Sequence, residues 1–319
     1  MKSWYEACNQ AATLIYKTVP DHYRSRTFSG IIGDIKALPP QKAQSLFNRK
    51  KGLGKQYAWL YLTKGIDEGK GYQACASEAL ASVLGPNRDD ILRGTVLDVG
   101  CAVGVTSGIL TLDRVTGFDL FPDVLAAARL VDSFTGRKNE YVVSDMTRTW
   151  PFGCVFDTVV CGLVCHHLKE QRDVVTFFSN MNRVLLPGSS VVITLPAGSV
   201  GTSKQFEMIA QALGHFGFRI DMKLTGMVCS TDYPNSLFWM FVITAKKISD
   251  VCGCEFISPD FGFHLYRTQE TRVEKGKKAR STATVQRKVK HELFKLTDLD
   301  EMLECYGEKN LVYEEHIRM

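Results

Sequence analysis

The stretch TVLDVGCAVG, residues 95–104, decides the fold of this chain. Its first half is a short apolar run that ends on a glycine, which is typical of a parallel strand buried on both faces. Residues 100–104 predict a tight turn, because glycine adopts dihedrals that a Cβ forbids and lets a ligand come close to the backbone. A helix-like segment follows, and its first N–H groups are free to bind an anion. The stretch therefore predicts a strand, a ligand-binding turn and a helix.

The spacing of the glycines narrows the kind of ligand. Gly100 is followed by Ala102, and the next glycines are Gly104 and Gly108. The G-x-G-x-x-G pattern of dinucleotide-binding turns is therefore absent. A carboxylate or a ligand of amino-acid size fits this turn better than a pyrophosphate.

Acidic residues follow at the ends of the next two predicted strands. Asp119 ends the second strand, 21 residues after Asp98 in the first. An acidic residue in that position can accept hydrogen bonds from both hydroxyls of a ribose. Asp145 follows the third strand, where it can accept a hydrogen bond from an adenine amine while Met146 contacts the ring. Because parallel strands end at the same edge of a sheet, these acids are expected side by side.

Strand-like and helix-like segments alternate as far as about residue 248. Such alternation predicts βαβ units and a mostly parallel sheet. The last two strands have no helix signal between them and are predicted as an antiparallel pair. The predicted strands are 95–99, 115–119, 141–144, 157–164, 190–195, 218–224 and 238–245, and the predicted helices include 172–185 and 206–216.

Several motifs in this block together resemble those of one known family, the class I, Rossmann-like methyltransferases. The resemblance covers roughly residues 85–248, about half of the chain. It implies a mostly parallel seven-stranded sheet with an antiparallel last strand, the cofactor S-adenosylmethionine and the product S-adenosylhomocysteine. The matching segments are VLDVGCAVG (96–104), GFDLFPDVLAAA (117–128), SDMTRTWPF (144–152), FDTVVCGLVCHHL (156–168), MNRVLLPGSSVVIT (181–194), GFRI (217–220) and FWMFVITAKK (238–247).

The resemblance also implies roles for individual residues. Asp98 organises the amino-acid end of the cofactor, Asp119 holds the ribose, and Asp145 and Met146 flank the adenine. Cys161 and Gly162 line the floor below the reactive sulfonium. The implied cofactor-binding set is Asp98, Gly100, Cys101, Gly104, Asp119, Leu120, Asp145, Met146, Cys161 and Gly162.

His166 and His167 directly follow the fourth predicted strand, at the mouth of the expected pocket. Either could take a proton from a substrate as a general base. The alternative is that one packs under the cofactor and the other caps the next helix. These two histidines are the candidate catalytic residues.

The charge of the chain lies mainly outside this block. The formal net charge is +5, but residues 1–84 hold 12 basic and 6 acidic residues, and residues 265–295 hold 10 and 3. Residues 1–84 are expected to form a helical cap, 85–248 the methyltransferase core, and 249–319 a C-terminal extension. The basic part of that extension, residues 265–290, is expected to be a mobile loop or a segment that orders on a partner. It is also a candidate RNA-binding segment.

Composition sets the class of protein. No run approaches about 18 apolar residues, so no membrane span is expected, and the first residues lack the apolar region of a secretory signal. Ten cysteines, several of them inside apolar runs, favour a reducing, cytoplasmic location without disulfides. The CGC at 252–254 with His264 beyond it does not match a common zinc spacing, and no metal is expected.

Three functions fit these observations. The first is an S-adenosylmethionine-dependent methyltransferase (EC 2.1.1.-) acting on oxygen, nitrogen or carbon of a small or medium-sized acceptor. The second is an RNA methyltransferase that uses the basic outer segments. The third is an inactive methyltransferase fold acting as a scaffold, which the intact set of Asp98, Gly100, Gly104 and Asp119 disfavours. CGLVCHH after the fourth strand, in place of a D/N-P-P-aromatic motif, disfavours methylation of amines on DNA bases. Oligomeric state has no signal in the sequence.

Overall fold

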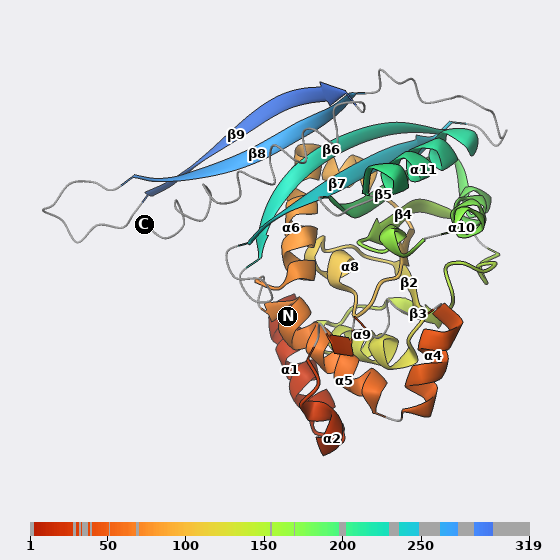
Figure 1. Ribbon diagram of the computed structural model, residues 1–319, viewed down its shortest axis with the longest axis vertical. Coiled ribbons are helices and arrows are strands. Elements are labelled where there is room, and N and C mark those ends of the chain that lie inside the picture. Colours follow the sequence, from red (N-terminus) through yellow and green to blue (C-terminus); the bar gives the residue numbers. More distant parts are fainter. Residues whose placement is uncertain are drawn as a thin grey trace, which may run out of the picture.

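The predicted strand and turn at residues 95–104 are followed by a helix, and this strand is third from one edge of a sheet with nine strands among the described residues. The computed structural model describes residues 3–27, 30, 31, 33, 38, 40–50, 52–67, 70–153, 155–168, 170–197, 202–229, 236–248, 262–273 and 284–295. The strands run in the order β3-β2-β1-β4-β5-β7-β6-β8-β9 (Figure 1). Their bounds are β1 Val96–Val99, β2 Val115–Asp119, β3 Glu140–Val143, β4 Phe156–Gly162, β5 Leu185–Ala197, β6 Phe218–Cys229, β7 Ser236–Lys247, β8 Gly262–Val273 and β9 Thr284–Lys295.

The first seven strands confirm the predicted class. Neighbouring strands among β1 to β5 pair in parallel, and β7 pairs antiparallel with both β5 and β6. This is the Rossmann-like, mostly parallel seven-stranded sheet with an antiparallel last strand. Side chains along each strand point alternately to the two faces of the sheet. Because both faces are covered, the strand sequences are nearly all apolar. Val96, Val160 and Val192 face one hydrophobic cluster, whereas Leu97 and Val159 face the other.

Helices cover both faces of the sheet. α10 (Gln171–Arg183) and α11 (Thr202–His215) pack on one face, and α6 (Tyr72–Leu84) with α8 (Val105–Ile109) on the other (Figure 1). α9 (Pro122–Thr135) connects β2 to β3, with Pro122 in its first turn, where proline is well tolerated. Helix α10 ends at Arg183, before the predicted residue 185, and β5 already begins at Leu185. Pro187 and Gly188 therefore lie inside β5 and not in a turn between the helix and the strand.

Residues 1–84, for which a helical cap was predicted, form helices where the structure describes them. The cap shares a buried cluster with the core, in which Leu53 and Ala58 pack with Val103, Val105 and Val124. The first helix starts with a capping box between Ser3 and Glu6. The helical elements before the sheet are α1 Trp4–Tyr16, α2 Asp21–Arg24, α4 Pro40–Arg49, α5 Leu53–Leu60, the π-helix η1 Tyr61–Gly65, α6, η3 Gly85–Asn87 and α7 Arg88–Ile91.

The C-terminal extension corrects one prediction. Residues 265–273 and 284–290 were expected in a mobile loop or in a segment that orders on a partner, yet they belong to β8 and β9, an antiparallel ribbon that adds to the edge of the sheet through β6 (Figure 1). A loop was predicted because the segment has few apolar residues. A two-stranded ribbon needs no apolar face, because its backbone groups pair with each other while both faces can be solvated. Residues 274–283 and the CGC at 252–254 lie outside the described residues.

Candidate functional site

The turn after β1 runs through three left-handed residues in alternation. Gly100, Ala102 and Gly104 have φ values of 65°, 50° and 76°. The turn is held against β2, because the N–H groups of Gly100 and Cys101 both donate to the carbonyl oxygen of Phe118, at 2.8 and 3.1 Å. A Cβ at Gly100 would overlap the side chain of Val164, so only glycine fits there. The turn is thus tightly fixed, with the first turn of α8 beyond it.

Asp98 lies under this turn as a buried carboxyl group with 1% of its surface exposed. Burial raises its pKa to about 7, although hydrogen bonds from the hydroxyl and N–H of Ser107 oppose the rise, and the charge of Asp119 adds to it. Its Oδ2 has no hydrogen-bond partner within the described structure. A buried acceptor of this kind is costly unless a donor reaches it. A bound ligand could supply the hydrogen-bond donor that Oδ2 of Asp98 lacks.

Asp119 ends β2 next to the turn, as predicted. Its Oδ2 accepts from the N–H of Ala102 at 3.0 Å and its Oδ1 from the N–H of Phe121 at 3.1 Å. Burial raises its pKa, while these backbone donors oppose the rise. A carboxylate has about four lone-pair sites, so each oxygen keeps capacity for a further donor. The Nε2 of Gln44, on helix α4 of the cap, donates to the carbonyl oxygen of the adjacent Leu120 at 3.1 Å.

Asp145 and Met146 follow β3, the next strand along the same edge. The N–H and hydroxyl of Thr147 donate to Oδ1 of Asp145, at 2.9 and 2.7 Å, which fixes the carboxylate at the start of the loop. Met146 is half-buried and packs against the large core cluster. Since β3 pairs with β2, and β2 with β1, the ends that carry Asp98, Asp119 and Asp145 lie at one edge of the sheet.

The end of β4 forms the other side of the site. The Sγ atoms of Cys161 and Cys165 lie 3.3 Å apart in the interior. Burial raises the pKa of Cys161 well above its ordinary value, as it does for Cys101. Burial therefore disfavours the thiolate, which is the nucleophilic form of cysteine, at both positions. Gly162 lies so close to Thr106 of α8 that a Cβ there would meet its hydroxyl.

The two histidines occupy a short 3-10 helix, η4 (Cys165–His167), directly after β4. His166 is half-buried and His167 is exposed. Their rings lie 3.9 Å apart between centroids and are tilted by 39°. They are placed at the same edge of the sheet as the turn, where the sequence predicted them.

Several residues around a small cavity at the turn had no signal in the sequence. The cavity has a volume of about 20 Å³, the space of about one water molecule. Oε1 of Gln73 is buried without a hydrogen-bond partner within the described structure, and the Ser77 and Thr106 hydroxyls lie 3.3 Å apart. Gln73 and Ser77 are polar residues one turn apart on a helix that is otherwise largely apolar, which is the one pattern that could have revealed them. The lining comprises Tyr61, Gln73, Ala76, Ser77, Leu80, Gly100, Cys101, Ala102, Val105, Thr106, Gly162, Leu163 and Thr194.

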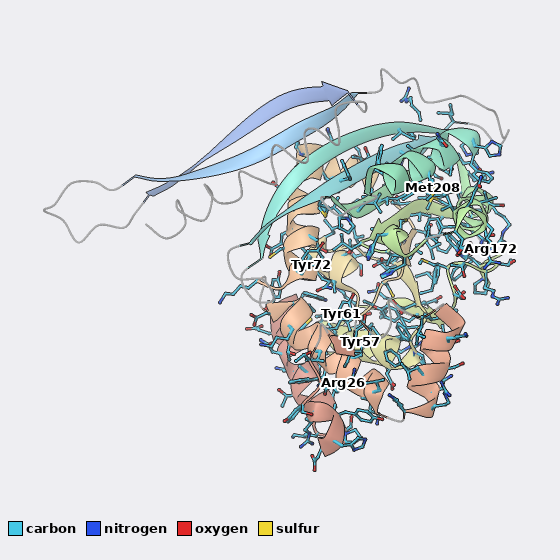
Figure 2. The ribbon with its side chains drawn as sticks, viewed as in Figure 1. Arg26, Tyr57, Tyr61, Tyr72, Arg172 and Met208 are labelled. Carbon is cyan, nitrogen blue, oxygen red and sulfur yellow. The ribbon has the colours of Figure 1, made fainter. Side chains whose placement is uncertain are left out.

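The aromatic stretch at residues 57–61 lies within the cap. Tyr57 and Tyr61 meet edge to face with their centroids 5.3 Å apart (Figure 2). Tyr57 is buried against Phe47 and Phe121, whereas Tyr61 lines the cavity at the turn. The stretch is therefore part of the helical packing, and one of its residues also reaches the candidate site.

The described residues contain no group of three His, Cys, Asp or Glu side chains that could hold a metal ion. Cys8, Cys75, Cys101, Cys161 and Cys165 are not paired in disulfides. None of the described helices has both the length and the apolar character that crossing a lipid bilayer requires.

Comparison with known proteins gives matches to methyltransferases. Three similar solved structures are a methyltransferase of magnesium protoporphyrin IX (ChlM) from Synechocystis PCC 6803, the N-methyltransferase NodS from Bradyrhizobium japonicum WM9, and a SAM-dependent methyltransferase from Methanosarcina mazei. Their identities to this chain are 16%, 15% and 19%, and their TM-scores 0.47, 0.44 and 0.41. The alignments cover 65%, 58% and 52% of this chain and 99%, 91% and 98% of theirs.

A search of curated protein sequences found no match. A family model described as a methyltransferase domain matches residues 97–193, from β1 into β5. This segment contains the turn, Asp119, Asp145 and the end of β4. Residues 97–193 are thus similar to this methyltransferase domain family over about a third of the chain, and they lie within the Rossmann-like sheet described above.

Proposed function

We propose that this protein transfers a methyl group from S-adenosylmethionine to oxygen, nitrogen or carbon of a small or medium-sized acceptor. The observation that carries the proposal is the buried, unpartnered Oδ2 of Asp98 beneath a turn of three left-handed residues. The proposed cofactor-binding residues are Asp98, Gly100, Cys101, Gly104, Asp119, Leu120, Asp145, Met146, Cys161 and Gly162. Residues 1–84, 85–248 and 249–319 are proposed as cap, catalytic core and extension.

The residues present fit the cofactor. An ammonium and a sulfonium are cationic groups, and the site offers them two buried acceptors without donors, Asp98 Oδ2 and Gln73 Oε1. Asp119 keeps capacity for the ribose hydroxyls while its oxygens also accept from the turn. Gly100 lies close to Val164, and Gly162 lies close to Thr106. Because neither position has room for a Cβ, a ligand would contact the backbone there.

The chain contributes position more than chemical activation. The bound cofactor supplies a methyl group on a sulfonium, which is already a reactive electrophile. The end of β4 and the turn after β1 fix the place of that group, and the cap residues Tyr61, Gln73 and Ser77 cover it. Holding two reactants in line is a major source of rate in such transfers. Where the acceptor must lose a proton, we propose His166 or His167 as the base, because both follow β4 at the same edge.

The cap must move before a cofactor enters. The cavity beside the turn holds about 20 Å³, whereas sites for ligands of drug size measure about 300–1,000 Å³. Contacts from the cap close it: Gln44 donates to the carbonyl of Leu120, and Ser77 lies against Thr106. We propose that α4, α5, η1 and α6 open for the cofactor and then close over it.

The experiment that tests the proposed site is calorimetric titration of the Gln73→Leu variant with S-adenosylhomocysteine. A hydrogen bond to a charged group contributes about 1.5–3 kcal/mol, so affinity should fall by about tenfold or more. Glu78→Gln is the matched control, because Glu78 lies on the same helix but is exposed and bonds to Tyr5. Equal affinity of Gln73→Leu and the wild type would remove Gln73 from the site.

RNA is the second candidate acceptor, and the register of the ribbon is the observation that favours it. In the backbone register of β8 and β9, Arg267 is paired with Lys290 and Gln269 with Lys288, so three basic residues lie at neighbouring positions of the ribbon. Replacing Arg267, Lys288 and Lys290 by Gln should weaken RNA binding and lower the slope of log affinity against log salt concentration by about three. Replacing Arg272 and Arg287, elsewhere in the same ribbon, is the control. Absence of RNA binding at low salt would leave only the small acceptor.

A further inference from the structure

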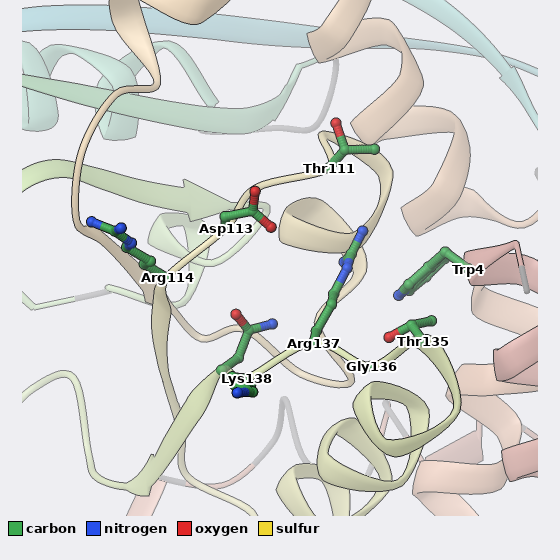
Figure 3. Close-up of a pocket in the computed structure, with 9 residues that line it drawn as sticks. Trp4, Thr111, Asp113, Arg114, Thr135, Gly136, Arg137 and Lys138 are labelled. Carbon is green, nitrogen blue, oxygen red and sulfur yellow. The ribbon is translucent and has the colours of Figure 1, made fainter. Parts of the chain in front are cut away.

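A second cavity lies at the opposite edge of the sheet from the candidate active site. It has a volume of about 550 Å³, within the range of about 300–1,000 Å³ that is usual for small-ligand sites. Its walls are the loop before β2, the loop before β3 and Trp4 of the cap (Figure 3). We call it the basal pocket, because it lies at the amino-terminal ends of the parallel strands. Nothing in the proposed methyl transfer uses it.

The charge of the basal pocket is predominantly positive. Arg114, Arg137 and Lys138 line it, and Asp113 is the one acidic residue among its lining side chains. Within the described part of the chain, none of the three cations forms an ion pair with a carboxylate. Three cations around one hollow that holds a single lining carboxylate repel each other, and an anion in the hollow would relieve that repulsion.

Arg137 is held in place by the fold. Its two terminal nitrogens donate to the carbonyl oxygens of Ser107 and Gly108, at 3.5 and 3.1 Å, at the end of α8. A guanidinium has five N–H donors, so three remain after these bonds. Figure 3 shows Arg137 standing beside Thr135 and the indole nitrogen of Trp4. A fixed guanidinium with free donors is the group that recognises phosphate by paired hydrogen bonds.

The loop before β2 carries backbone strain beside these cations. Thr111 and Arg114 are non-glycine residues with φ values of 53° and 57°, and Asp113 lies between them. Strained residues cluster where a fold positions groups for a ligand, and here the strain falls on residues that line the basal pocket.

We propose that the basal pocket binds the phosphate group of a small phosphorylated molecule, with Arg114, Arg137 and Lys138 as its cationic partners. A concave hollow suits a compact ligand, whereas a nucleic-acid backbone needs an extended basic surface. The hydroxyl of Thr111 adds a neutral donor to the same wall. The inference does not depend on the proposed methyl transfer, because it concerns other residues at the other edge of the sheet.

The test is calorimetric titration of the full-length protein with inorganic phosphate and with pyrophosphate at constant ionic strength. We expect saturable binding of both, and at least about a tenfold loss of affinity, which is about 1.4 kcal/mol, in the double variant Arg114→Gln/Lys138→Gln. Both replaced side chains are exposed, so the variant should fold. Arg172→Gln is the matched control, since Arg172 is 83% exposed on helix α10, away from the pocket.

Three results would overturn the proposal. The first is the absence of saturable binding with either anion. The second is equal binding by the double variant and the wild type. The third is binding of a 5′-phosphorylated RNA oligonucleotide that the double variant loses, without binding of the free anions, which would assign the pocket to nucleic acid. Arg137→Lys gives an independent check, because it keeps the positive charge and loses the paired hydrogen bonds of the guanidinium. Its affinity should lie between those of the wild type and the double variant.

Discussion

Ala102 is the one non-glycine residue among the three left-handed positions of the turn after β1. It sits at φ 50° with its N–H on Asp119, so the fold holds an alanine in a conformation that favours glycine. The strain of about 1–2 kcal/mol is offset by burial and by that hydrogen bond. The turn therefore keeps its shape without glycine at this position.

We expect the Ala102→Gly variant to keep the fold and the cofactor site. Relief of strain and the greater freedom of glycine in the unfolded chain nearly cancel, so the free energy of unfolding should change by less than about 1 kcal/mol. Gly100→Ala should lower the free energy of unfolding by about 1–3 kcal/mol and abolish binding of S-adenosylhomocysteine, because the new Cβ meets Val164. Urea denaturation and calorimetry measure both effects. Equal behaviour of the two variants would contradict the assigned geometry of the turn.

Asp98 should make the stability of the protein without cofactor fall as the pH rises. The folded pKa is about 7 against an ordinary 3.8, so between these values the folded chain binds a proton that the unfolded chain has released. The contribution is present in full below pH 3.8, declines between about pH 4 and 7, and is constant above. Three pKa units correspond to about 4 kcal/mol as an upper figure.

Replacement of Asp98 by Asn removes that titration. The variant should be more stable than the wild type at pH 8, and its free energy of unfolding should depend less on pH between 4 and 7. Urea denaturation at a series of pH values gives the two curves. Parallel curves for the wild type and Asp98→Asn would show that Asp98 is not the group that titrates.

Substitution of the histidines after β4 should change the pH dependence of turnover. For an acceptor that must lose a proton, Gln in place of the catalytic histidine should lower kcat by about 10²–10⁴-fold. It should also remove the rise in activity between about pH 5 and 8 that a histidine base produces. His166→Gln and His167→Gln serve as controls for each other. Unchanged turnover and pH profile in both would exclude histidine from the mechanism.

At the scale of elements, the strands and helices that carry the turn were predictable, because apolar runs on both faces of a parallel strand leave a plain signal. β1 and β2 were predicted to within a residue, and β7 lies antiparallel as expected. The start of β5 and the β8–β9 ribbon were not predictable. Pro187 and Gly188 normally end elements, and a solvated ribbon has no apolar alternation.

The cap is the element whose motion the proposed function requires. We expect amide hydrogens of α4, η1 and α6 to exchange faster than those of β1 and β4 without cofactor, and to become protected when S-adenosylhomocysteine binds. Hydrogen exchange read by mass spectrometry measures this directly. The turn from Gly100 to Gly104 should gain protection in the same experiment. Protection confined to the turn, with none in the cap, would contradict closure of the cap over the cofactor.

At the scale of the whole molecule, the sequence specified the cofactor side of the site and left the acceptor side open. Asp98, Asp119 and Asp145 could be placed together because they end adjacent parallel strands. Gln73 and Ser77 reach the same turn only through tertiary packing of a helix more than twenty residues upstream. The basal pocket likewise joins Trp4 to residues 111–139, a contact that no local pattern contains.

Binding of the cofactor tests the central claim most directly. Calorimetric titration of the full-length protein with S-adenosylmethionine and with S-adenosylhomocysteine should show saturable binding of both at one site per chain. The Asp119→Ala variant should lose at least about tenfold in affinity, since it removes a charged acceptor for the ribose. No heat with either compound, from protein that melts cooperatively, would contradict the claim that this chain is a working methyltransferase.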